Sequence, residues 1–134
     1  MELRKCSEFL YVLNYRNIMR IVNCMKHAAN IRLVDGELFT LLPSGNIANV
    51  DTSTIPATDV QTEFGTVHTA GKTVYGELTG LPEPVEGVCY YVNMLVFNVA
   101  TAAGRKDVVM GDSGPSAERN EKGFVSAITT LIFA

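Results

Sequence analysis

Histidine and cysteine are the side chains that most often carry catalysis near neutral pH, and this sequence has few of them. His27 and His68 are its two histidines, and each could act as a general base. Cys24 precedes His27 by three residues, but a Cys–His nucleophile needs a third group that orients the histidine, and this short segment offers none. We therefore expect no nucleophilic catalysis from this pair.

Other catalytic motifs are missing as well. The sequence has no nucleophile elbow, no phosphate-binding glycine loop, no dinucleotide-binding motif and no zinc-protease motif. A metal site built on the histidines would need nearby carboxylates, and no i, i+4 spacing supplies them. We expect no metal, no cofactor and no enzymatic activity. A small nucleotide hydrolase acting through His27 or Asp107 is the least favoured alternative.

Arginines close to acidic residues are the best candidates for binding. Arg105 and Asp107 are two residues apart, so on a strand they share a face, and Arg119 follows in the next hairpin. Arginine recognises carboxylates and phosphates through two parallel hydrogen bonds. These residues predict one of two roles. They contact an anionic ligand or partner, or they interact with other parts of the same chain. In the internal arrangement, Arg105 caps a helix and Asp107 pairs with Arg119.

Further polar and aromatic residues complete the predicted ligand-binding set. Glu83 lies between two prolines on a rigid turn. Ser44 lies in a Pro-Ser-Gly turn, whose backbone N–H groups could hold an anion. One ring of the Tyr90–Tyr91 pair, which we assign to Tyr91, could stack on a base. With His27 added, the predicted site has arginines and fixed dipoles but no nucleophile.

Composition limits the class of partner. The chain has 134 residues, 11 Lys and Arg against 14 Asp and Glu, and a net charge of −3. Because it lacks the basic excess that neutralises phosphates, we predict no nucleic-acid partner. We predict no membrane partner, because no apolar run reaches the roughly 20 residues of a spanning helix. The three cysteines have no paired spacing, which argues against a disulfide framework and for a reducing, cytoplasmic setting.

Turn residues divide the chain into short strands around one uncharged segment. Asp35-Gly36 predicts a hairpin over residues 28–42. Asn93 as N-cap and Gly104 as stop predict a helix, with a longer strand as the alternative. We expect a loop or irregular edge over 51–62 and a turn over 70–72. The other predicted strands cover residues 20–23, 46–51, 64–68, 73–75, 88–92, 107–110 and 124–133.

These elements predict an α+β fold for residues 19–134. We expect a mostly antiparallel sheet or a small barrel, with one buried helix near Asn93–Gly104. An uncharged helix must be covered on more than one face. Since that helix and the apolar C-terminal strand exceed what one small domain can cover, we expect a homo-oligomer. Residues 1–18 are expected to be an N-terminal extension or a loosely attached helix.

Several short motifs follow one another from about Ile21 to Leu131: VN and HA-N-I, PSG, GLPEP with a later Y-V, GR-D, and R-E-G. Their order resembles a family of small uncharacterised bacteriophage and prophage proteins. The chain differs from the usual pattern of that family at Asn49, where arginine is common. It also differs at Asn93, where serine is common, and at Gly111, where proline is common.

The resemblance implies a phage accessory protein in the cytoplasm of the infected bacterium. We expect non-enzymatic binding of a host defence protein, or of a small nucleotide-type signal, whose sequestration would inhibit host antiviral defence. This expectation rests on association with phages and on the lack of a catalytic constellation. The first alternative is a virion or assembly component, which the strand-rich sequence and the expected oligomer indicate.

Overall fold

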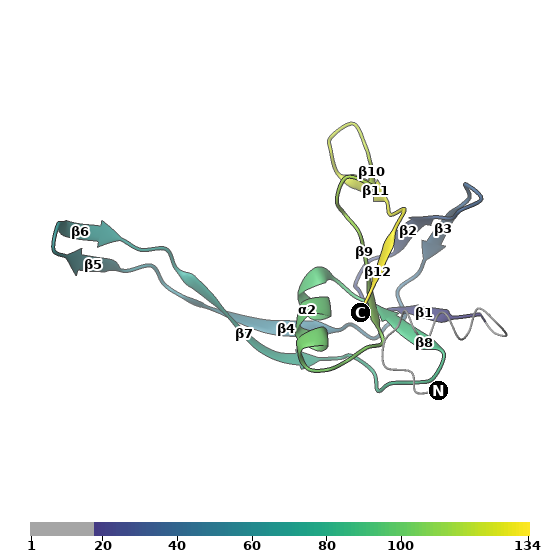
Figure 1. Ribbon diagram of the computed structural model, residues 1–134, viewed down its shortest axis with the longest axis horizontal. Coiled ribbons are helices and arrows are strands. Elements are labelled where there is room, and N and C mark those ends of the chain that lie inside the picture. Colours follow the sequence, from purple (N-terminus) through teal and green to yellow (C-terminus); the bar gives the residue numbers. More distant parts are fainter. Residues whose placement is uncertain (1–17) are drawn as a thin grey trace.

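The structure is a computed structural model that describes residues 18–134 (Figure 1). A central sheet carries one helix and two short hairpins, and a long two-stranded ribbon extends away from it (Figure 1). The prediction of a strand-rich fold with one helix is confirmed for the described residues. The prediction for residues 1–18 falls, apart from Ile18, outside them.

The central sheet is mixed. Its strand order is β1-β8-β9-β12, where β1 and β9 run parallel to β8 and β12 runs antiparallel to β9. Parallel neighbours need a crossover connection, and helix α2 supplies it between β8 and β9. The bounds are β1 Arg20–Asn23, β8 Val88–Tyr91, α2 Met94–Ala102, β9 Val108–Gly111 and β12 Leu131–Phe133.

Helix α2 begins where its capping residue predicts. The Asn93 side chain accepts a hydrogen bond from the Val96 N–H at 2.9 Å, which satisfies one of the free donors of the first turn. Val96 and Ala100 are buried, whereas Met94 is 64% exposed. Leu95, Phe97 and Val99 are partly buried against the same core cluster, and Met94, Asn98 and Ala102 form the exposed strip of the helix. The central sheet contacts α2 through β9, and the base of the ribbon contacts it through β4 and β7, which agrees with the expectation of a helix covered on more than one face.

Side-chain alternation divides the core into two layers. Tyr90 of β8 and Val108 of β9 point toward α2 and pack with Val96. Tyr91 and Val109, one position further along each strand, pack on the opposite face of the sheet. A four-residue strand buried on both faces needs apolar residues at consecutive positions, which explains the uninterrupted apolar sequence of β8.

The ribbon, which we call the arm (residues 49–79), has two antiparallel parts. β4 (Asn49–Ile55) pairs with β7 (Lys72–Thr79), and beyond them β5 (Asp59–Thr62) pairs with β6 (Gly65–His68). The prediction of a loop or irregular edge over 51–62 is wrong, since these residues belong to one side of the arm. The predicted turn at 70–72 is also wrong, because the chain reverses at Glu63-Phe64.

Two short hairpins lie beside the sheet: β2 (Ala29–Arg32) with β3 (Leu38–Leu41), and β10 (Glu118–Arg119) with β11 (Val125–Ala127). The first confirms the predicted turn, in which Gly36 has φ +92°. Arg32 links the hairpins through two 2.9 Å hydrogen bonds to the Glu118 carboxylate, and these lower the pKa of Glu118. The predicted strand over 124–133 is divided into β11 and β12.

The described strands form one four-stranded and four two-stranded sheets. The small-barrel alternative is therefore wrong for this part of the chain. β1 and β12 are the two ends of the central sheet order, and no pairing joins one to the other. The arm also leaves the body and does not fold back on it (Figure 1).

The two cysteines of the described segment are both fully buried. Cys89 is disulfide-bonded, so the sequence argument against disulfides is wrong at this cysteine. Cys24 is the free cysteine within residues 18–134. Burial raises the pKa of the Cys24 thiol, which keeps it in the unreactive protonated form.

Asn23 is the buried polar side chain of the core, 1% exposed. Its Nδ2 donates to the carbonyl oxygens of His27 at 2.9 Å and Leu41 at 3.0 Å. Its Oδ1 accepts from the Met25 N–H at 2.9 Å. Its backbone oxygen accepts hydrogen bonds from both the N–H and the hydroxyl of Ser44. One residue at the end of β1 thus connects a loop, the end of β3 and the Pro-Ser-Gly turn.

We predict that Asn23→Ala lowers the free energy of unfolding by about 3 kcal/mol, because each buried group left unsatisfied costs about 1–3 kcal/mol. Urea denaturation followed by circular dichroism measures this loss. Asn46→Ala is the matched control, since Asn46 is exposed and its side chain makes no hydrogen bond. Equal losses for the two variants would contradict the assigned role of Asn23.

Candidate functional site

The residues predicted to bind a ligand lie at several places in the fold. The structure brings Arg105 and Asp107 together next to the Pro82–Pro84 turn, and it brings His27 and Tyr91 together at one cavity. Neither Ser44 nor Arg119 has a hydrogen bond or ion pair to the other predicted site residues. A single site made of all these residues does not form within residues 18–134.

Arg105 is engaged inside the protein. Its Nε and one terminal nitrogen donate to the two carboxylate oxygens of Asp107, both at 2.9 Å, and that terminal nitrogen also donates to the Pro82 carbonyl at 2.7 Å. The side chains are 23% and 16% exposed. The hydrogen bonds to Asp107 raise the pKa of the Arg105 guanidinium. The two-point contact that would recognise an external anion is therefore made with Asp107.

The turn that contains Glu83 is held from two sides. Arg105 binds the carbonyl of Pro82, and the Tyr90 hydroxyl donates to the backbone carbonyl of Glu83 at 2.9 Å. Burial is the main cause that raises the pKa of Tyr90, so this hydroxyl stays a donor. The turn is fixed to β8 and to the segment between α2 and β9, and Glu83 is exposed on it.

The other residues predicted to contact an anion also make hydrogen bonds within the protein. Arg119 donates to the carbonyl oxygens of Gly123 and Ser113, which ties two turns together. The Ser44 N–H donates to the Asn23 carbonyl at 3.0 Å and so is not directed at an anion. The internal alternative in which Asp107 pairs with Arg119 is wrong, since Arg105 occupies both carboxylate oxygens.

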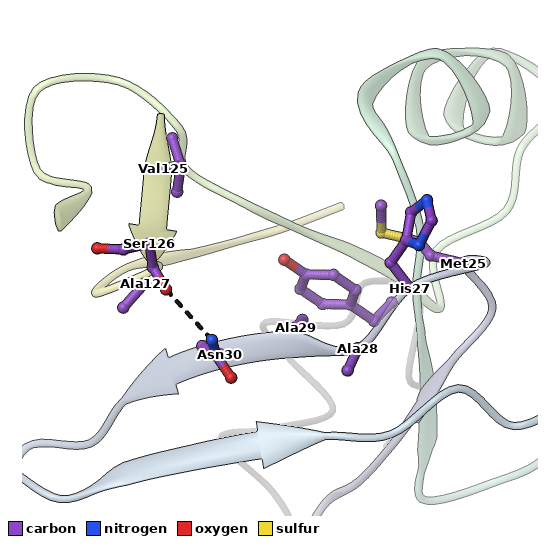
Figure 2. Close-up of a pocket in the computed structure, with 9 residues that line it drawn as sticks. Met25, His27, Ala28, Ala29, Asn30, Val125, Ser126 and Ala127 are labelled. Atoms are coloured by element: carbon purple, nitrogen blue, oxygen red, sulfur yellow. Dashed lines mark hydrogen bonds between the residues drawn. The ribbon is translucent and has the colours of Figure 1, made fainter. Parts of the chain in front are cut away.

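A cavity of about 200 Å³ lies between β2 and β11 (Figure 2). His27 and Met25 lie on one side, and Val125, Ser126 and Ala127 lie on the other (Figure 2). Asn30 joins the two walls by donating to the Ser126 carbonyl at 3.3 Å. The lining residues are Met25, His27, Ala28, Ala29, Asn30, Tyr91, Val125, Ser126 and Ala127.

The cavity suits an uncharged or aromatic group of side-chain size. Three alanines line it together with polar residues such as Asn30 and Ser126, and no acidic residue lines it. Pockets for drug-sized ligands measure about 300–1,000 Å³, so this cavity is small for a nucleotide. Within the described segment, no cluster of three His, Cys, Asp or Glu residues could hold a metal ion.

Comparison with protein-family models, with curated proteins and with solved structures finds no match for this chain. The resemblance to phage proteins stays a prediction, and function has to be argued from the residues. No helix between residues 18 and 134 has the length and apolar character needed to cross a membrane.

The feature that sequence reasoning missed is the surface of the arm. From Asp51 to Glu77 every residue is exposed except the half-buried Thr62. Ser53 pairs with Val74 and Ile55 pairs with Lys72, so Ile55 and Val74 share one face of the ribbon. The large apolar side chains exposed on the arm are Ile55 (52%), Val60 (46%), Phe64 (80%), Val67 (38%), Val74 (44%) and Tyr75 (57%).

The arm is anchored only at its base. Val50 is buried and Leu78 is partly buried in the layer under α2, and these two residues pair across β4 and β7. A two-stranded ribbon is marginally stable in water without a third layer. The alternating β-branched residues of 49–55 and 72–79 were the sequence signal that could have shown these paired strands.

We predict that Arg105→Ala lowers the free energy of unfolding by about 1.5–3 kcal/mol, the range for a charged hydrogen bond. A double-mutant cycle with Asp107→Ala should show coupling between the two residues, measured by urea denaturation. Arg119→Ala is the control, because this arginine is exposed and contacts only turn carbonyls. Unchanged stability of Arg105→Ala would refute a structural role and favour the predicted ligand contact.

Proposed function

We propose that this protein is a non-enzymatic assembly component whose arm binds a neighbouring subunit. The observation that carries the proposal is the arm, a two-stranded ribbon with six large apolar side chains exposed along it. Exposed apolar surface that is contiguous along one element marks interaction sites. A ribbon that is marginal in water becomes stable when another surface covers it.

The resemblance to phage proteins favours a bacteriophage particle, or its assembly, as the setting. Strand-rich subunits that extend a ribbon can contact a neighbour far from their own core. The internal hydrogen bonds of Arg105 and Arg119 support this assembly function over ligand capture, because they occupy the cations that were expected to bind a ligand.

The second candidate function is sequestration of a host defence protein or a small nucleotide-type signal. The cavity lined by His27 and Tyr91 supports it, because an aromatic ring there could stack on the base of such a signal while the rest of the ligand stays outside. Thermal denaturation with a panel of cyclic nucleotides and ADP-ribose derivatives tests it. A raised melting temperature with intact ligand recovered would support sequestration, and the absence of any shift would reject a nucleotide ligand.

We predict that shortening the arm abolishes assembly and leaves the body folded. Ile55 and Lys72 are a cross-strand pair, so residues 56–71 can be replaced by a two-residue Asn-Gly turn. The body should remain folded because its core clusters contain no residue of the deleted segment. Sedimentation velocity over a concentration series should show assembly for the full chain and a monomer for the shortened one.

Circular dichroism and the urea midpoint provide the control for folding of the shortened chain. A substitution at the base, Leu78→Ala, should by contrast lower stability, since Leu78 packs against the core cluster under α2. If the shortened and full chains show the same mass at every concentration, the arm is not an assembly element and the proposal is wrong.

A further inference from the structure

We propose that the tip of the arm of one copy inserts Phe64 into the cavity between β2 and β11 of a second copy. This inference rests on the proposed function and specifies the partner and the contact. Phe64 is 80% exposed, the most exposed aromatic ring of the described segment. Buried aromatic anchors in fitted pockets contribute most of the binding free energy at protein interfaces.

The tip presents Phe64 on a hydrogen-bonded turn. The Thr62 hydroxyl donates to the Gly65 carbonyl at 2.6 Å across the turn. Behind it, Val60 pairs with Val67 on one face of the ribbon, and Asp59 contacts His68 at 2.6 Å on the adjacent pair. A preformed turn loses less conformational entropy on binding than a free loop does.

The cavity matches the tip in size. Its volume of about 200 Å³ suits one aromatic side chain, and its lining combines apolar side chains with the polar His27, Asn30 and Ser126. The Asn30 side chain donates to the Ser126 carbonyl at 3.3 Å, which ties β2 to β11 beside the cavity.

Charge also favours this pairing. Asp59 and Glu63 flank Phe64 on the tip, and the arm as a whole has four acidic residues, Asp51, Asp59, Glu63 and Glu77, against one lysine, Lys72. The rim of the cavity has His27, with Lys26 beside it, and both are exposed. Complementary charges at an interface guide association and orient the partners.

The occupant must come from another copy. The tip, at β5 and β6, lies at the far end of the arm, on the opposite side of the molecule from β2 and β11 (Figure 1). The tip therefore cannot reach its own cavity. Contact between a tip and the cavity of the next copy joins two different surfaces, and such contacts form closed rings or open filaments.

Two variants each remove one side of this contact. Phe64→Ser lacks the anchor but keeps the cavity, whereas Ala28→Trp fills the cavity but keeps the anchor. Each variant alone should weaken assembly by about thirtyfold or more, the effect of removing a dominant interface residue. Mixed in equal amounts, the variants should form a heterodimer and stop there, because one intact tip meets one intact cavity. Sedimentation velocity with one variant labelled measures this directly.

Matched controls are Met94→Ser and Ala103→Trp, which change exposed residues on the helix side of the sheet. Both should assemble like the unchanged chain. If Phe64→Ser and Ala28→Trp assemble normally while the shortened arm does not, arm-mediated assembly stands and docking in this cavity is wrong. If the unchanged chain is monomeric at every concentration, or if the mixture forms no heterodimer, a second copy is not the occupant.

Discussion

The carboxamide of Asn23 is hydrogen-bonded to three backbone groups inside the core, and the shape of the surrounding structure depends on it. Two of these groups, the Met25 N–H and the His27 carbonyl, belong to the loop that forms one wall of the cavity. The third is the Leu41 carbonyl at the end of β3. The same residue therefore orders the sheet edge, the β2–β3 hairpin and the cavity. Burying an amide is favourable only when its groups are satisfied in this way.

The second constraint is the distribution of apolar surface. The body buries a small core in two layers, while the arm leaves its apolar side chains exposed. No other part of residues 18–134 covers them, because the arm leaves the body at its base (Figure 1). We propose that association covers this surface. The same association gives a role to a cavity that suits one side chain more closely than it suits a nucleotide.

Local features could be predicted from the sequence and long-range ones could not. The Asp35-Gly36 turn and the Asn93 cap depend on backbone preferences of adjacent residues, and both are confirmed. In the order β1-β8-β9-β12, β1 pairs with β8 more than sixty residues further along the chain, which no local pattern specifies. The sequence predicts a turn at Gly71, but a Cβ atom there would lie 2.9 Å from the Ile55 carbonyl oxygen, so glycine permits close approach of the two strands.

The residues of the predicted site lie at separate places in the fold, because long-range contacts decide their positions too. Arg105 and Asp107 are close in sequence, and their spacing predicts a shared face but not the ion pair that they form with each other. His27 and Tyr91 are far apart in the sequence, and only the fold places them at the same cavity. The β11 residues that line the cavity, such as Val125 and Ala127, belong to no motif that would have marked them as site residues. The arm went unrecognised as one element because Pro56 and Gly71 interrupt its strand pattern.

Hydrogen exchange tests the central claim most directly, because it reports on the arm and the cavity in the unmodified protein. Backbone amides of residues 51–77 and of residues 25–30 should exchange quickly in dilute solution. At concentrations where the protein assembles, exchange in both segments should slow together, while exchange in α2 stays the same. Unchanged exchange of the arm in the assembled protein would contradict the claim that another subunit covers it.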